Sequence, residues 1–250
     1  MGSQSIEIAM PDGTAEAYVS RPATGGPGVL LYIDAIGLRP RIHDMADRIA
    51  SWGHVVMAPN AFYRDGRVAD LAPTTDLRQP GARDDFFAGI GDRIANYTPE
   101  RSDRDLDSYV ETLLGLDGVA GPTIGVTGYC IGGRSAIRAA GLRPDVVAAA
   151  GAFHAAGLVT DADDSPHRLV TRAAAEILAG HADQDRANPP EAIAAFEAAM
   201  DEAGITYTSA IYPGAPHGFT MADTSAYDEA GTERHFAELQ ALLARTLGRR

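Results

Sequence analysis

Residues 123–133, Thr-Ile-Gly-Val-Thr-Gly-Tyr-Cys-Ile-Gly-Gly, decide the fold class of this chain. The apolar run 123–127 is typical of a buried strand and a helix is expected from Gly133, so Cys130 stands at the apex of a tight strand–turn–helix junction. Glycines suit the positions beside it, because strand and helix pack closely there. The N–H groups and the dipole of the opening helix favour a thiolate and later an oxyanion. The alternative is that Cys130 is a small buried apolar residue, but the glycine frame favours a nucleophile.

Strand-like and helix-like segments alternate along the rest of the chain. We expect strands over residues 6–10, 15–20, 28–33, 54–58, 123–127, 146–150, 175–179 and 206–212. We expect helices over residues 41–52, 106–116, 133–140, 191–203 and 235–247. This alternation predicts an α/β fold, with a mostly parallel central sheet, helices on both of its faces and an opening hairpin.

One stretch of the chain departs from this regular pattern. Residues 60–103 are rich in Arg, Asp, Gly and Pro, whereas the chain as a whole is expected to form a single domain over residues 1–250. A long excursion in a compact α/β domain often builds a lid or a wall of the substrate pocket. A solvated surface loop with one or two helices is the alternative.

The composition excludes several function classes. A formal net charge of −13 argues against a nucleic-acid partner, because few cations are available to displace counterions from phosphates. The single cysteine rules out an internal disulfide, and a free thiol suits a reducing compartment. No membrane-length apolar run or signal-peptide pattern is visible, so we expect a cytoplasmic protein without a membrane partner. Metal-ligand spacing and a dinucleotide fingerprint are both missing, so we expect no metal and no cofactor.

Further chemical groups follow two later strands of the expected sheet. Gly180-His181-Ala182-Asp183 follows the strand 175–179, and His217 lies in a Pro- and Gly-rich loop after the strand 206–212. A thiol nucleophile needs a base such as imidazole, and the imidazole needs a carboxylate that fixes its tautomer. We expect His217 as the base and Asp183 as the acid, with Asp185 as the alternative. The order nucleophile, acid, histidine is that of the α/β-hydrolase fold.

The loop after the strand 28–33 is expected to complete the site. In this fold the loop normally supplies the second oxyanion donor, so the N–H of Ala35 or of Ile36 is expected to act beside that of Ile131. Asp34 places a carboxylate at the mouth of the site. It could accept the thiol hydrogen bond in the resting protein and disfavour a thiolate through like charge; a helix or turn cap is the alternative.

With these motifs assembled, nearly the whole chain resembles the dienelactone hydrolase family. The resemblance rests on four segments. They are the strand–turn–helix elbow at residues 128–133 (Gly-Tyr-Cys-Ile-Gly-Gly), residues 180–183 (Gly-His-Ala-Asp), residues 213–219 (Pro-Gly-Ala-Pro-His-Gly-Phe) and residues 59–64 (Pro-Asn-Ala-Phe-Tyr-Arg). It implies an α/β-hydrolase fold and a Cys-His-Asp triad that hydrolyses an enol-lactone. Family members typically carry Glu after the early strand, paired with the thiol until substrate arrives; here the matching residue is Asp34.

The substrate-binding residues depart further from the family pattern. Members that act on dienelactone bind its carboxylate with arginines, one of them shortly after the catalytic histidine, where this chain has Thr220 and Met221. We expect a replacement from the irregular stretch. The candidates are Arg64, Arg83 and Arg93, and we include Arg83 among the expected substrate-binding residues. The others are His154, Tyr129 and Phe219.

The sequence therefore favours a Cys130-dependent hydrolase of a small-molecule ester or lactone. A non-catalytic or redox-sensing α/β-hydrolase-like protein, which uses Cys130 as a reactive thiol, is the alternative from another class. A thioester or peptide-like acyl substrate is a third hypothesis, because the fold does not decide it.

Overall fold

The computed structural model describes residues 2–248, so three residues of the expected 1–250 domain, Met1, Arg249 and Arg250, lie outside the described residues. Eight strands in this part of the chain form one sheet in the order β1-β2-β4-β3-β5-β6-β7-β8. The strands are β1 (Gly2–Met10), β2 (Gly13–Arg21), β3 (Gly26–Tyr32), β4 (Val55–Pro59), β5 (Val119–Tyr129), β6 (Val147–Phe153), β7 (Glu176–Ala182) and β8 (Tyr207–Tyr212). The opening hairpin β1–β2 is antiparallel, whereas β3 to β8 run parallel.

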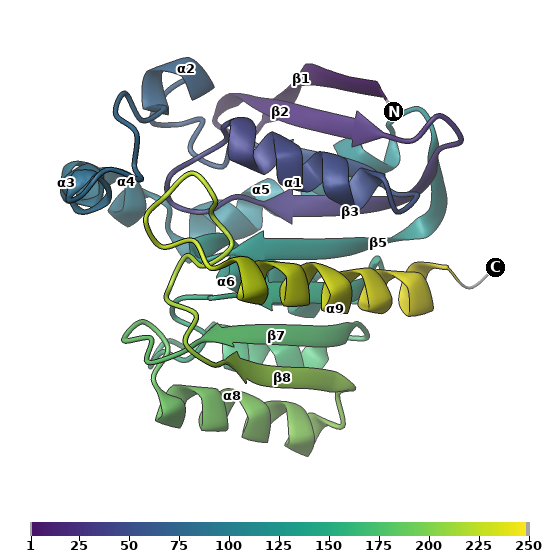
Figure 1. The fold of residues 1–250 in the computed structure, drawn as a ribbon. Coiled ribbons are helices and arrows are strands. Elements are labelled where there is room, and N and C mark those ends of the chain that lie inside the picture. The colour runs from purple at the N-terminus through teal and green to yellow at the C-terminus, as the bar shows by residue number, and fades with distance from the viewer. Residues whose placement is uncertain (1, 249–250) are drawn as a thin grey trace.

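Helices cover both faces of the sheet. They are α1 (Pro40–Ala50), α2 (Val68–Leu71), α3 (Ala82–Gly89), α4 (Gly91–Asn96), α5 (Pro99–Leu114), α6 (Ile131–Leu142), α7 (Pro166–Leu169), α8 (Pro190–Ala203) and α9 (Glu229–Leu247), with a 3-10 turn at Val170–Arg172. Residues of α1 and α9 share one buried apolar cluster with the sheet face that is in front in Figure 1, and α5, α6 and α8 share a second cluster with the other face. The expected α/β-hydrolase fold, with its mostly parallel sheet, is confirmed.

Several elements extend beyond the apolar pattern that predicted them. α5 begins at Pro99 rather than at Leu106, because the hydroxyl of Thr98 accepts the N–H of Arg101 (3.3 Å) and proline suits the first position of a helix. β7 continues past Ala179 to Ala182, so the motif that follows it starts inside the strand. Polar caps and mixed composition, rather than apolar periodicity, set these ends.

The parallel strands all deliver their carboxyl ends to one edge of the molecule. In Figure 1 this edge is on the left, where α3, α4 and the loop between β8 and α9 also lie. Ligands of open α/β sheets bind outside the carboxyl ends of the strands. The fold therefore places the turns after β3, β5, β7 and β8 around one region.

The irregular stretch 60–103 contains α2, α3, α4 and the start of α5. None of the α3 residues, all of which the structure describes, is buried. Nη2 of Arg83 in α3 donates to the carbonyl oxygen of His217 (3.3 Å), which connects α3 to the loop after β8. Within residues 2–248, no helix combines the length and the apolar character needed to span a membrane.

Candidate active site

Cys130 occupies a strained turn between β5 and α6. Its backbone is in the positive-φ region (φ 56°, ψ −119°), which side chains with a Cβ rarely adopt. The N–H of Cys130 donates to the carbonyl oxygen of Phe153 at the end of β6 (3.1 Å), so the neighbouring strand helps to hold the turn. Strain of this kind persists where the surroundings fix it, and it is concentrated at functional sites.

Two glycines allow this turn to close. A Cβ on Gly128 would lie 2.1 Å from the carbonyl oxygen of Gly132, and a Cβ on Gly132 would lie 2.3 Å from that of Ile33. No side chain fits at either position, as the sequence pattern predicted. The second contact also brings the first turn of α6 against the turn after β3.

His217 bridges Cys130 and Asp185. Its Nε2 lies 3.1 Å from Sγ of Cys130, and its Nδ1 lies 2.6 Å from Oδ2 of Asp185. Burial opposes protonation of the ring, but the hydrogen bonds to Asp185 and then to Cys130 outweigh it and raise the pKa of His217 to about 10. Burial raises the pKa of Asp185, yet the hydrogen bond to His217 leaves that pKa below its usual value. The geometry favours an imidazolium held between a carboxylate and the sulfur.

The acid beside His217 is Asp185 and not Asp183, so the preferred sequence assignment was wrong about this contact. Asp183 follows β7 directly, and its Oδ2 accepts the N–H of Gly214 (2.8 Å). Gln184 then adopts a positive φ of 53°, which turns the chain so that the next carboxylate reaches the histidine. Asp183 thus fastens the turn after β8, while Asp185 contacts the ring.

Two backbone N–H groups remain available near the thiol. Those of Ala35 and Ile131 have no hydrogen-bond partner within residues 2–248. The N–H of Ile36, in contrast, donates to Oδ1 of Asp34 (3.1 Å). Of the two alternatives in the turn after β3, Ala35 therefore has the free donor.

Asp34 is not paired with the thiol, which corrects the expectation for this residue. Its Oδ1 accepts Nη1 of Arg39 (2.6 Å) and its Oδ2 accepts Nη2 of the same guanidinium (3.1 Å). Oδ1 also accepts the N–H groups of Ile36 and Gly37, at 3.1 and 3.3 Å. Arg39 was missed at the sequence level because no motif indicates that it folds back onto the turn.

A small cavity of about 10 Å³ lies at Cys130. Besides Cys130 and His217, its walls include Asp34, Arg83, Phe87, His154 and Met221. The volume is roughly that of one water-sized probe, so a bound acyl group would extend out of the cavity or displace its walls. Arg83 and Phe87 come from α3, so the irregular stretch supplies part of the wall.

His154 lies beside the base. It is fully buried, its Nε2 lies 2.8 Å from Oγ1 of Thr220, and its ring meets that of His217 edge-on with the centroids 5.3 Å apart. Burial, and then the charge of His217, lower the pKa of His154 well below its usual value. The neutral ring can therefore stand next to a protonated one.

Two expected pocket residues do not reach the cavity. Tyr129 and Phe219 are fully buried; the hydroxyl of Tyr129 lies 3.1 Å from Nε2 of His235, and Phe219 stacks on Tyr212. The side chain next to the elbow apex points away from it, toward α9. Both expectations of substrate contact are therefore corrected to core packing.

The other two candidate arginines, Arg64 and Arg93, form hydrogen bonds with other groups of the protein. Arg64 pairs with Asp12 and Asp105 and does not line the cavity at Cys130. Nη2 of Arg93 donates to the carbonyl oxygen of Ala35 (3.0 Å), so Arg93 supports the turn after β3. Among the three, only Arg83 lines the cavity.

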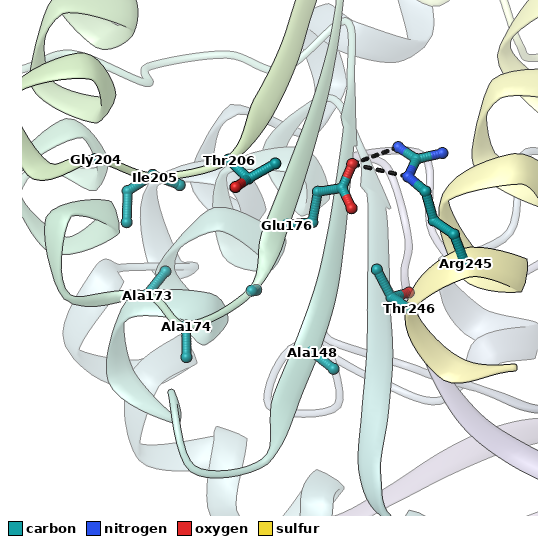
Figure 2. Close-up of a pocket in the computed structure, with 10 residues that line it drawn as sticks. Ala148, Ala173, Ala174, Glu176, Gly204, Ile205, Thr206, Arg245 and Thr246 are labelled. Atoms are coloured by element: carbon teal, nitrogen blue, oxygen red, sulfur yellow. Dashed lines mark hydrogen bonds and ion pairs between the residues drawn. The ribbon is translucent and has the colours of Figure 1, made fainter. Parts of the chain in front are cut away.

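A wider hollow of about 450 Å³ lies at the opposite edge of the sheet, where β6 and β7 begin (Figure 2). The side chains of Glu176 and Arg245 form an ion pair on its wall (2.6 Å), and small residues such as Ala148 and Ala174 supply much of the rest. The described residues bring no three His, Cys, Asp or Glu side chains together as a metal site, here or elsewhere. We therefore place the candidate active site at Cys130.

Comparison with known proteins agrees with this geometry. The model of the dienelactone hydrolase family matches residues 15–247, a range that includes every group of the candidate site. The chain belongs to the dienelactone hydrolase family. Its fold and its strand–turn–helix elbow at Cys130 are those expected, and Asp185 rather than Asp183 is the carboxylate that contacts His217.

Individual relatives of this dienelactone hydrolase family member are distant. A Methylorubrum extorquens protein named "Putative carboxymethylenebutenolidase" is 28% identical over 221 residues, covering 86% of this chain and 71% of that protein. The crystal structure of a "Putative Dienelactone Hydrolase" from Klebsiella pneumoniae superposes with a TM-score of 0.82 at 21% identity, over 98% of both chains. A dienelactone hydrolase-like promiscuous phosphotriesterase from metagenomic libraries gives 0.76 at 18% identity, over 99% of both chains. The two structures support the fold.

Proposed function

We propose that this protein hydrolyses a small lactone or carboxylic ester through an acyl-enzyme on Cys130. The observation that carries the proposal is the continuous contact from Sγ of Cys130 through His217 to Asp185, at 3.1 and 2.6 Å. The triad acid is then Asp185 rather than Asp183. The family match supports the reaction class, and the geometry supports the residue roles proposed here.

The first half of the reaction forms a thioester. The thiolate of Cys130 attacks the carbonyl carbon, and the N–H groups of Ala35 and Ile131 stabilise the resulting oxyanion. Nε2 of His217 donates its proton to the leaving alkoxide as the C–O bond breaks, which opens the ring of a lactone. Asp185 stabilises the imidazolium until the proton leaves.

The second half releases the product. Nε2 of His217, now neutral, takes a proton from water as the water oxygen attacks the thioester carbon. Collapse of the second oxyanion breaks the C–S bond, frees the carboxylic acid and restores the thiolate beside an imidazolium. The protons balance, and no external acid or base is needed.

Arg83 suits a substrate that carries a carboxylate of its own. It lines the cavity, and among the described carboxylates its ion-pair partner is the exposed Asp84 at 3.9 Å. A substrate carboxylate would give this guanidinium a closer partner. Arg83→Met should therefore raise KM for an anionic lactone by about tenfold or more and leave that for a neutral ester nearly unchanged.

The proposal is tested by hydrolysis of p-nitrophenyl acetate and of a cis-dienelactone, measured side by side. We expect turnover by the wild type, a trace with Cys130→Ser and none with Cys130→Ala. Lactone turnover well above ester turnover would identify the family activity, and ester turnover alone would move the natural substrate elsewhere. Full activity of Cys130→Ala would refute the proposal, and no Cys130-dependent turnover of either compound would favour the reactive-thiol alternative.

A further inference from the structure

An ion cluster with a buried arginine joins the turn after β3 to the loop that carries His217. Its centre is the guanidinium of Arg39, which is only 4% exposed. It contacts Asp34 on one side, at 2.6 and 3.1 Å, and Asp223 on the other, at 2.6 and 3.2 Å. Asp223 lies in the same loop as His217, so one side chain connects both halves of the site.

Arg39 also fixes the geometry of the turn itself. Nη1 donates to the carbonyl oxygen of Gly37 (2.9 Å), and Nη2 lies 3.3 Å from the sulfur of Met221. Every oxygen of the Asp34 carboxylate is occupied by Arg39 or by a turn N–H. Asp34 lines the cavity beside Cys130, yet its charge is compensated and both of its carboxylate oxygens accept hydrogen bonds.

We propose that Arg39 is a positioning residue that keeps Asp34 from suppressing the Cys130 thiolate, so that the thiol is paired with His217 before any substrate binds. An uncompensated carboxylate in the same small cavity would disfavour a thiolate by like charge and would offer the thiol proton an acceptor. With Arg39 present, Nε2 of His217 is the partner of the sulfur, at 3.1 Å. The proposal deepens the proposed function, because it assigns the resting state of the same nucleophile.

Other charged and titratable groups face the thiol from several elements. His217, backed by Asp185, comes from the loop after β8; His154 follows β6 and Arg83 lies in α3. Arg93 acts on Asp34 electrostatically from α4. None of these groups is substituted in the variants below, so a difference between the Arg39 variant and the double variant reports on Arg39 and Asp34.

The test is the pH profile of alkylation of Cys130 by iodoacetamide, followed by mass spectrometry. The chain has one cysteine, so a single adduct reports this thiol alone. The plateau rate reflects access to the cavity, whereas the midpoint of the profile reflects ionisation. Arg39→Met should move the midpoint upward by about 1 pH unit or more, and the double variant Arg39→Met with Asp34→Asn should return it to the wild-type position.

A matched control separates this effect from a loss of stability. Arg138 is another buried arginine, 2% exposed and paired with Asp103 and Asp164, away from the cavity. Arg138→Met should lower the melting temperature and leave the alkylation midpoint unchanged. If Arg39→Met does not fold, Arg39→Gln takes its place, because it removes the charge and keeps hydrogen-bond donors.

An unchanged midpoint in the Arg39 variant, or a shift that persists in the double variant, would overturn the proposal. Either result is distinct from failure of the proposed function, because alkylation requires no turnover. A wild type that is alkylated with the expected profile but hydrolyses neither substrate would uphold the role of Arg39 and reject the hydrolase assignment.

Discussion

Two aspartates after β7 provide a matched comparison at the level of single residues. Asp185→Asn should lower kcat/KM by about 10²- to 10⁴-fold, because the ring of His217 loses the charge that holds its tautomer and stabilises the imidazolium. Asp183→Asn keeps an oxygen for the N–H of Gly214 and should cost less than about tenfold. Steady-state kinetics on the same ester would decide, and the reverse ranking would return the triad role to Asp183.

The raised pKa of His217 predicts a pH-dependent stability. The ordinary value is 6.5 and the folded value is about 10, so the protonated ring stabilises the fold fully below pH 6.5. This contribution is lost as the pH rises through 10. Urea unfolding of wild type and of His217→Gln should show a wild-type advantage that shrinks between pH 6.5 and 10, whereas a constant difference would contradict the charged ring.

A residue of the site could be predicted from the sequence only where a local pattern determines its position. The glycines around Cys130 predict that it lies at the turn between strand and helix. The Pro- and Gly-rich loop after β8 predicts that His217 lies near it. The choice between Asp183 and Asp185 depends on the positive φ of Gln184, which nothing in its residue type requires. The partner of Asp34 depends on how Arg39 packs, a tertiary contact that has no sequence signature.

The junction of β5 and α6 offers a test at the level of secondary-structure elements. Gly132→Ala places a Cβ 2.3 Å from the carbonyl oxygen of Ile33, so we expect a loss of about 1–3 kcal/mol in stability and a large loss of activity. Gly91→Ala, at the start of α4, meets nothing within 4 Å and should be neutral or slightly stabilising. Thermal unfolding of both variants measures the contrast, and equal melting temperatures would mean that the elbow can relax.

The helix α3 is expected to be the least protected element around the cavity. It has no buried residue, whereas most of α6 is buried, and the cavity that its Arg83 and Phe87 line is small. Backbone amides of residues 86–89 should therefore exchange with deuterium at least about 10²-fold faster than those in the middle of α6. Equal protection would argue that α3 is a fixed wall rather than a lid.

The ends of the helices and strands were harder to predict than the presence of these elements. Apolar runs located the parallel strands β3 to β8, because parallel strands buried on both faces are continuous apolar runs. Helix starts such as Pro99 and Glu229 were missed, because polar caps at Thr98 and Asp228 determine them. In both helices the apolar face that the sequence pattern detects begins several residues after the first helical residue.

At the scale of the whole molecule, we propose that the chain folds as a single domain. The site draws on the ends of four strands of one sheet, so catalysis requires the complete sheet. Loss of esterase activity and loss of far-ultraviolet circular dichroism should therefore share one midpoint in urea. An activity midpoint well below the structural one would indicate that the site opens first, with α3 as the first segment to examine.

The order of the strands has a consequence for synthesis of the protein. From β3 outward the sheet runs β3-β5-β6-β7-β8, so each new strand is added at the growing edge in the order of the chain. The ribosome releases the amino-terminal part of a chain first, and a domain generally folds as a unit. His217 follows β8, the last strand, so the thiol of a nascent chain has no histidine partner until β8 has docked. We therefore expect a ribosome-bound fragment that ends before His217 to lack the side chain that contacts the Cys130 thiol in the complete fold.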